Sequence, residues 1–202
     1  MRTSDCMASK AFPCDDVRHE GYILPSVNVT PEEVRIFMIS EAAPQDAADY
    51  YYAGGNPLFQ QTTVMAFNDA GAKVTSIADI LALGVYLTTA VKCAKTEYGI
   101  KTTTIKECSL ILEKELELFS RVKVLLLMGD VAIKAINEIA KRAGEERVIP
   151  TGSTYKIRGG EYYFRGKRAL PSYLQAGPSF FIEKTKRRAI EEDIATALSL
   201  LS

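Results

Sequence analysis

The residues of this chain best suited to bind a metal are four cysteines and one histidine. Cys93 and Cys108 are fifteen positions apart, and Cys6 and Cys14 lie near the N-terminus. Four thiolates without a pair of histidines suit zinc or an iron–sulfur cluster. No CxxC pair is present, and free cysteines that pack as small hydrophobic residues remain the alternative. Because His19 is the only histidine, schemes that need two or more histidines are excluded.

Charge is distributed unevenly along a chain whose formal net charge is zero. Residues 1–60 hold 4 Lys or Arg and 9 Asp or Glu, whereas residues 141–188 hold 12 and 4, respectively. The basic segment could therefore face an anion. The alternative is a solvated basic surface that is balanced in space by acidic neighbours.

The composition predicts a single globular domain over residues 1–202, with residues 1–30 as an N-terminal segment. The chain is 47% hydrophobic and 25% charged, which is close to the average for globular proteins. The longest apolar run, Val124–Met128, is shorter than the roughly 18 residues that a membrane span needs, and the N-terminus lacks the apolar stretch of a signal peptide. We therefore expect a cytoplasmic monomer that does not bind membranes.

An alternation of strands and helices must position any functional residues. Strands are predicted at 34–39, 85–91, 122–128 and up to Leu170, helices at 58–68, 104–119, 131–142 and 182–201, and a hairpin at 155–164 that turns at Gly159-Gly160. This order predicts an α/β fold, a three-layer αβα sandwich with a central, mainly parallel four-stranded sheet. Ligands of such sheets bind beyond the carboxyl ends of the strands. The loops predicted there are 40–57, 92–103, 129–130 and 171–178.

Five short motifs stand in or next to these loops: Ser40–Pro44 (SEAAP), Gly55–Leu58 (GNPL), Val85–Cys93 (VYLTTAVKC), Val124–Ala132 (VLLLMGDVA) and Leu170–Ser172 (LPS). Together they resemble the motifs of the uracil-DNA glycosylase superfamily, and most closely those of its iron–sulfur family 4. The resemblance extends from about Val34 to Leu201. It implies the αβα fold and a DNA-repair enzyme for base excision, which hydrolyses the N-glycosidic bond of a damaged base flipped out of the DNA.

The resemblance also implies a cofactor. Family members bind a four-iron four-sulfur (4Fe-4S) cluster through two N-terminal cysteines and two cysteines spaced like Cys93 and Cys108. The expected ligands are therefore Cys6, Cys14, Cys93 and Cys108, although the N-terminal pair here has seven residues between its members rather than the family's two. The cluster would be structural and would hold the N-terminal segment against the loop after the second strand.

Glu41 matches the acid of the family's first motif, so the resemblance makes it the catalytic residue. A carboxylate next to the sugar activates water or stabilises the cation that forms when the glycosidic bond breaks. The alternative is that Glu41 caps a helix or forms a salt bridge. Asp46 and Asp49 are further acids in the same loop.

Three of the four expected base-binding positions depart from the family pattern. Leu170 stands in place of its histidine, Thr89 in place of its asparagine and Leu58 in place of its stacking phenylalanine, while Phe59 lies next to Leu58. Leu170 and Thr89 favour a second hypothesis, in which the protein is a non-catalytic relative that binds nucleic acid or a nucleobase and retains the cluster as a scaffold. Glu41 favours the enzyme, with weak or altered base specificity.

The segment after Leu170 resembles the loop with which the family enters the duplex. Ser172, Tyr173 and Leu174 are the expected DNA-binding residues of this loop, with Tyr173 or Leu174 as the wedge. An ordinary turn that covers the sheet is the alternative. The basic residues expected to contact DNA phosphates are Arg168, Lys184, Arg187 and Arg188.

Overall fold

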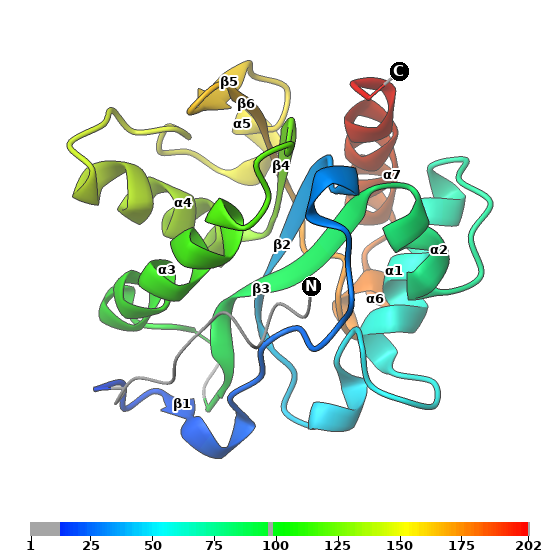
Figure 1. Cartoon of the computed structure of the whole chain (residues 1–202), viewed down its shortest axis with the longest axis horizontal. Helices are drawn as coiled ribbons and strands as arrows, with labels where there is room; N and C mark the ends of the chain where they lie inside the picture. Colours follow the sequence, from blue (N-terminus) through cyan, green and yellow to red (C-terminus); the bar gives the residue numbers. More distant parts are fainter. Residues whose placement is uncertain (1–12, 97–98, 202) are drawn as a thin grey trace.

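The computed structural model describes residues 13–96 and 99–201, whose strands form one mixed sheet in the order β1-β3-β2-β4-β6-β5 (Figure 1). The strands β3, β2, β4 and β6 are parallel, and β1 and β5 pair antiparallel with the two outer members of this group. The expected α/β fold is confirmed, but the four-stranded sheet is corrected to a mixed sheet of six strands. The two edge strands are only two and three residues long. The strands are β1 (Val17–Arg18), β2 (Ile36–Ala43), β3 (Val85–Lys95), β4 (Val124–Met128), β5 (Tyr162–Phe164) and β6 (Lys167–Ser172).

Helices cover both faces of the sheet (Figure 1). One face is covered by α3 and α4, and the other by α1, α2, α6 and α7. None of the helices in the described residues is long and apolar enough to cross a membrane. The helices are α1 (Leu58–Asp69), α2 (Ile77–Ala82), α3 (Thr102–Glu117), α4 (Asp130–Arg142), α5 (Thr154–Ile157), α6 (Ser179–Ile182) and α7 (Lys184–Ser199), with short 3₁₀ helices at His19–Gly21, Pro31–Glu33 and Ala47–Asp49.

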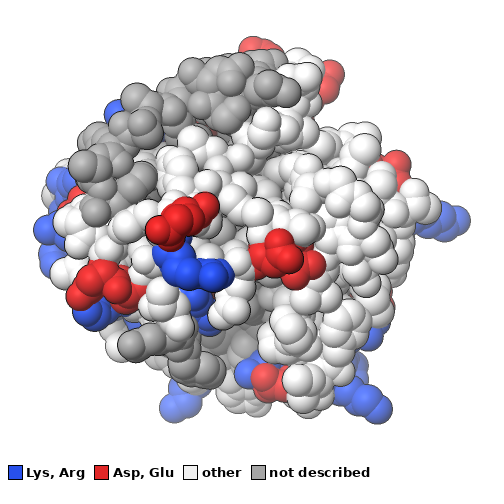
Figure 2. Space-filling model, turned by 90° about the horizontal axis from the view of Figure 1, so that it is seen from below, with Lys and Arg blue, Asp and Glu red and all other residues white. Residues whose placement is uncertain are grey.

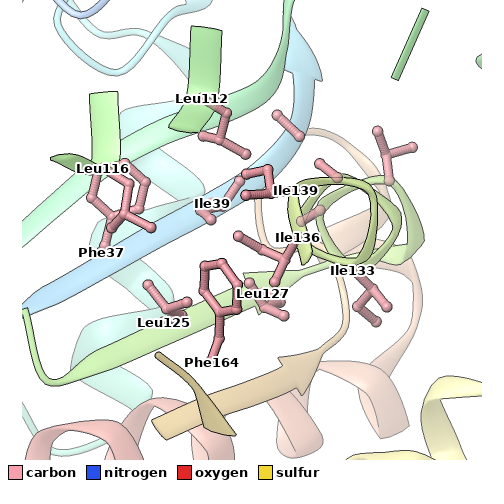
Figure 3. Packing of buried hydrophobic residues seen from close by; sticks show 14 of the residues in the cluster. Phe37, Ile39, Leu112, Leu116, Leu125, Leu127, Ile133, Ile136, Ile139 and Phe164 are labelled. Atoms are coloured by element: carbon pink, nitrogen blue, oxygen red, sulfur yellow. The ribbon is translucent and has the colours of Figure 1, made fainter. Parts of the chain in front are cut away.

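The central strands are apolar along their whole length because both of their faces are covered. In β2, Phe37 and Ile39 point toward α3 and α4, where Figure 3 shows them packed with Leu112 and Ile136. Ile36 and Met38 point to the opposite face and belong to the second apolar cluster. Each large side chain that is fully buried in this way contributes about 1.5–3 kcal/mol to folding.

The hairpin predicted at 155–164 is wrong. Its first half folds into α5, and β5 pairs instead with β6 across the two residues Arg165 and Gly166. Both residues have positive φ, 48° and 75°, as type I′ hairpin turns require. Glycine is the usual residue for such φ values, and for this reason the sequence pattern pointed to Gly159-Gly160.

Two further helices were not predicted. Ser76 and Asp79 form a reciprocal capping box at the start of α2, which gives this six-residue helix a defined beginning. The closing helix predicted at 182–201 forms α7 from Lys184, and the residues just before it, Ser179–Ile182, form the separate α6. The short α6 therefore belongs to the loops at the carboxyl end of the sheet.

Candidate active site

Glu41 lies near the end of β2, where its carboxylate meets the beginning of α4. The carboxylate accepts hydrogen bonds from the backbone N–H groups of Asp130 and Val131. Such N–H groups have no partner within their own helix and attract negative charge. The helix-capping alternative for Glu41 is therefore realised in the structure. It does not exclude a chemical role, because the carboxylate also faces two cavities.

Burial is the main influence on the acidity of Glu41 and raises its pKa above the ordinary value. The negative charge of Asp130 raises the pKa further, whereas the two backbone hydrogen bonds and the positive charge of Lys95 lower it. The group therefore has a less favourable environment for its charge than a surface carboxylate has. A carboxylate in this state is suited to accept a proton or to stabilise a nearby cation.

The two cavities lie at the carboxyl end of the sheet. The larger, of about 650 Å³, lies between residues 41–46 and residues 174–182, and Phe59 and Lys95 also line it. The smaller, of about 320 Å³, is lined by the start of α4, by Tyr173 and by parts of α6 and α7. Glu41, Leu174 and Ser179 line both cavities. The Glu41 side chain thus belongs to the walls of both cavities.

Two of the expected base-binding residues line the larger cavity. Leu58 and Phe59 stand at its wall in the first turn of α1, and the backbone N–H of Leu58 donates to Asp49 Oδ1 at 3.1 Å. The ring of Phe59 packs against the buried ring of Tyr51, with centroids 5.3 Å apart. Although Leu58 stands in the expected aromatic position, its neighbour brings an aromatic ring to the cavity.

The other two expected base-binding residues do not line either cavity. Thr89 is fully buried in β3, and its hydroxyl has no hydrogen-bond partner among the described residues. Leu170 is 5% exposed, and it pairs in register with Leu126 of β4 inside the apolar cluster. Contact of these two side chains with a base would require a rearrangement of the site.

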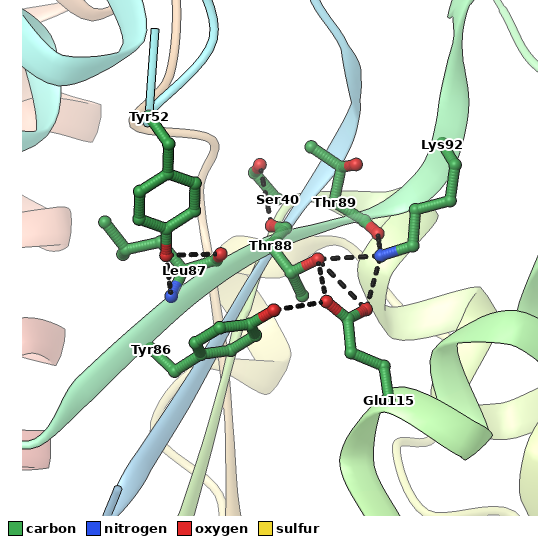
Figure 4. A network of polar contacts seen from close by, with 8 residues as sticks. All are labelled: Ser40, Tyr52, Tyr86, Leu87, Thr88, Thr89, Lys92 and Glu115. Carbon is green, nitrogen blue, oxygen red and sulfur yellow. Dashed lines mark hydrogen bonds and ion pairs between the residues drawn. The ribbon is translucent and has the colours of Figure 1, made fainter. Parts of the chain in front are cut away.

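A buried ion pair lies next to Thr89. Lys92 Nζ lies 2.5 Å from Glu115 Oε2, and both side chains are fully buried. The ammonium group also donates to the Thr89 carbonyl and to Thr88 Oγ1, while the Tyr86 hydroxyl donates to Glu115 Oε1 at 2.7 Å (Figure 4). Because all three ammonium protons have acceptors, the pair fixes this part of β3 on α3.

The expected wedge loop follows β6 directly. Ser172 is buried, and its carbonyl accepts a hydrogen bond from the backbone N–H of Gly129 at 3.0 Å. Tyr173 and Leu174 are half-buried, and Lys186 Nζ lies 5.6 Å from the centre of the Tyr173 ring. The next residue, Gln175, is fully buried and donates to the Tyr51 hydroxyl at 2.9 Å. The loop is thus anchored on both sides of Tyr173 and Leu174.

Acidic partners neutralise much of the basic excess of residues 141–188. Arg187 forms a two-pronged contact with Asp69 of α1, at 2.5 and 2.8 Å, while Arg168 donates to the Gly160 carbonyl. Lys184 and Arg188 are exposed, and the Arg188 guanidinium lies 3.5 Å from Glu192. On the face seen from below Figure 1, most described basic side chains lie around the rim, and a group nearer the middle lies beside acidic side chains, so they form no continuous area (Figure 2).

Three of the four predicted cluster ligands lie in the described residues, and Cys6 lies outside them. Cys93 of β3 and Cys108 of α3 are buried, and the half-buried Cys14 packs against the same apolar cluster. Burial raises the pKa of Cys93 to about 12, with further contributions from the charges of Cys108 and Cys14. Within residues 13–96 and 99–201, no group of three or more His, Cys, Asp and Glu side chains is placed to hold a metal ion. The neighbouring thiols fit the donor chemistry of an iron–sulfur cluster, with an incomplete ligand set.

Two residues at the larger cavity were not singled out by the sequence analysis. Lys95 ends β3, and its half-buried side chain lines the cavity together with Glu41. Ile182 ends α6 at the rim of the cavity and is 76% exposed. No local pattern marks either residue, because each reaches the cavity only through the packing of distant segments.

Comparison with known families gives one match. The family model of the uracil DNA glycosylase superfamily matches residues 27–194. No curated protein matches the chain. The matched residues include β2, Gly129 and the loop after β6, which together position Glu41 between its two cavities. Because the match covers most of its length and every element of this site, the chain belongs to the uracil DNA glycosylase superfamily.

Proposed function

We propose that this protein is a DNA N-glycosylase that removes a base flipped out of the DNA, with Glu41 acting next to the sugar. The superfamily generally comprises DNA glycosylases, which act on DNA. The more specific proposal rests on one observation. Two backbone N–H groups at the start of α4 hold the Glu41 carboxylate at the junction of two cavities.

The reaction needs a carboxylate on one side of the bond that breaks. As the C1′–N bond opens, its electron pair leaves with the base and positive charge develops on the sugar. Ionised Glu41 stabilises this charge and accepts a proton from the water that attacks C1′. The larger cavity receives the base, which stacks against Phe59.

The loop after β6 supplies the contact that replaces the extruded base. Leu174 is the better placed wedge, because it lines both cavities, whereas the ring of Tyr173 lies beneath Lys186. Lys184 and Arg188 are exposed next to this loop and contact phosphates on either side of the site. Arg187 is already paired with Asp69, so it holds α7 on α1.

A 4Fe-4S cluster completes the proposal as a structural cofactor. Support comes from Cys93 near the carboxyl end of β3 and from Cys108 and Cys14, whose charges influence the pKa of Cys93; Cys6 would supply the fourth thiolate. The cluster would join the N-terminal segment to β3 and α3. It would not take part in the chemistry at Glu41, which this chain's own side chains perform.

Cleavage of defined oligonucleotides tests the proposed activity. Duplexes that carry uracil, hypoxanthine, xanthine or a mismatched thymine are incubated with the protein, and abasic products are cleaved with alkali. We expect excision of at least one of these bases by the wild-type protein and none by Glu41→Gln. Glu146→Gln, which removes an exposed carboxylate outside both cavities, is the matched control. Equal activity of wild-type protein and Glu41→Gln would contradict the role of Glu41.

One observation favours the non-catalytic alternative. Thr89 and Leu170 occupy two expected base-binding positions, yet both side chains are buried away from the cavities. A protein of this kind binds DNA or a nucleobase but excises no base from DNA. The same oligonucleotides distinguish the two functions, because the alternative predicts tight binding without abasic product.

A further inference from the structure

Lys95 and Glu41 face the same cavity from the ends of neighbouring parallel strands. Ala43 of β2 is paired with Ala94 of β3, so the ends of these strands lie side by side. Among the described residues that line the 650 Å³ cavity, Lys95 is the only basic one. The rest of the wall is mainly small or apolar, apart from the acids of residues 41–49.

The two side chains also influence each other electrostatically. The positive charge of Lys95 favours the ionised form of Glu41, against the opposing effects of burial and of Asp130. The backbone N–H groups of Asp130 and Val131 also lower its pKa. The other charged side chains that share a cavity with Glu41 are Glu183, Lys186 and Arg187 in the smaller one and Asp46 and Asp49 in the larger one. Lys95 is thus close enough for its charge to be felt at the carboxylate, and it does not belong to the helix that caps Glu41.

A glycosylase site must accommodate two opposite charges. The sugar becomes positive next to Glu41, and the departing base becomes negative when it takes the electron pair of the C1′–N bond. Leu170 is buried and apolar, and the Thr89 hydroxyl does not reach the cavity, so neither can donate a hydrogen bond to the base there. An ammonium group in a mainly apolar cavity interacts with such an anion far more strongly than it would in water.

We propose that Lys95 is a catalytic residue that donates a hydrogen bond to the departing base and stabilises its negative charge. This inference rests on the proposed glycosylase function. Glu41 accepts the proton of the attacking water, whose hydroxyl adds to C1′, and the base later takes up a proton from solvent. The ammonium group of Lys95 keeps its own protons throughout, so the reaction balances without any further reactant.

Excision kinetics test the catalytic role of Lys95. On the best substrate of the oligonucleotide panel, Lys95→Met lowers the single-turnover rate by roughly 10²- to 10³-fold, the usual effect of removing one donor to a developing anion. Lys95→Arg restores part of this loss because it retains the charge. Lys123→Met removes an exposed lysine next to the start of β4 and leaves the rate unchanged. Equal rates for Lys95→Met and Lys123→Met overturn the proposal.

The pH dependence gives a readout that a purely structural role of Lys95 would not change. The rate should fall on the acid side as Glu41 becomes protonated. Without the positive charge of Lys95, Glu41 is protonated at higher pH, so this acid limb moves upward in Lys95→Met and stays near its wild-type position in Lys95→Arg. An acid limb at the same pH in all three proteins contradicts the proposal.

A binding experiment tests the anion site without turnover. Barbiturate is a pyrimidine that is negatively charged at neutral pH, whereas uracil is neutral. Calorimetry should show that the wild-type protein and Lys95→Arg prefer barbiturate over uracil and that Lys95→Met loses this preference. If the wild-type protein excises no base, the glycosylase function fails, and barbiturate binding alone decides whether Lys95 forms an anion site. An unchanged preference in Lys95→Met overturns the inference.

Discussion

The backbone of Gly129 lies directly against the carboxylate of Glu41, so that a Cβ atom on residue 129 would stand 2.5 Å from Glu41 Oε1. Gly129 precedes α4 with φ 103° and ψ 166°, a conformation that is almost restricted to glycine. The absence of a side chain therefore serves two purposes. It permits the turn from β4 into α4, and it lets the carboxylate reach the N–H groups at the start of the helix.

Gly129→Ala should consequently impair both stability and activity. The backbone strain alone costs about 1–3 kcal/mol, and the new methyl group must also displace Glu41. Gly144→Ala is a matched control at the other end of α4, with φ 72° and open space around the new Cβ. It should lower stability by about 1 kcal/mol and leave excision unchanged. Urea denaturation measures the stability of both variants, and the oligonucleotide assay measures their excision activity. Equal losses of stability and activity in the two variants would contradict this prediction.

Glu41 should make folding stability depend on pH. Its pKa is raised in the folded protein, so the folded state binds more protons than the unfolded state between the two pKa values. The free energy of unfolding therefore decreases as the pH rises from the ordinary Glu pKa through the raised one, and the loss is complete above it. Thermal unfolding at a series of pH values should show this decrease in the wild-type protein but not in Glu41→Gln. Parallel curves for the two proteins would refute the raised pKa.

The cysteines should bind iron when the protein is purified without oxygen. We expect brown protein with the broad visible absorption of thiolate-bound iron, and loss of that absorption in Cys93→Ser and Cys108→Ser. Leu112→Ala, one turn after Cys108 on α3, controls for simple destabilisation. This substitution should lower the free energy of unfolding by about 2–5 kcal/mol, and the variant should still bind iron. Colourless, iron-free wild-type protein would rule out the cluster.

The two neighbouring arginines of α7 should have different roles. Arg188 is 81% exposed, so Arg188→Ala should weaken binding to all DNA sequences and lower the salt slope by about one unit, as expected for one lost phosphate contact. Arg187→Ala should lower the melting temperature, because Asp69 loses its partner. Arg121→Ala removes an exposed charge just before β4 and should change neither the salt slope of DNA binding nor the melting temperature. A salt slope that is identical in Arg188→Ala and wild-type protein would show that Arg188 contacts no phosphate.

The buried pair of Lys92 and Glu115 should show strong coupling. Lys92→Met leaves the Glu115 carboxylate buried without its cation. It should therefore lower the free energy of unfolding by about 3–5 kcal/mol. Adding Glu115→Gln removes the unpaired charge while the amide oxygen still accepts from Tyr86. The double variant should therefore be more stable than Lys92→Met alone. A double-mutant cycle with urea denaturation measures this coupling, and purely additive losses would argue against it.

The central strands and the long helices could be predicted from the sequence, because their signals are local. The run Val124–Met128 forms a strand covered on both faces, and the periodic apolar residues of 131–142 form a helix. The order of these elements requires parallel strands whose carboxyl ends share one edge. On that edge the sequence alone could place Glu41, and the motif containing it resembled the family to which the chain belongs.

The surroundings of Glu41 were decided only by the tertiary structure. Periodicity does not reveal which turn closes a hairpin when a non-glycine residue, Arg165, adopts positive φ, nor that Thr89 and Leu170 point into the interior. Lys95 carries no local signal, and it reaches the cavity because β3 continues beside β2 to their shared end. Cavities and the charges that line them arise from contacts between residues far apart in the sequence, whereas strands and helices arise from patterns within a few residues.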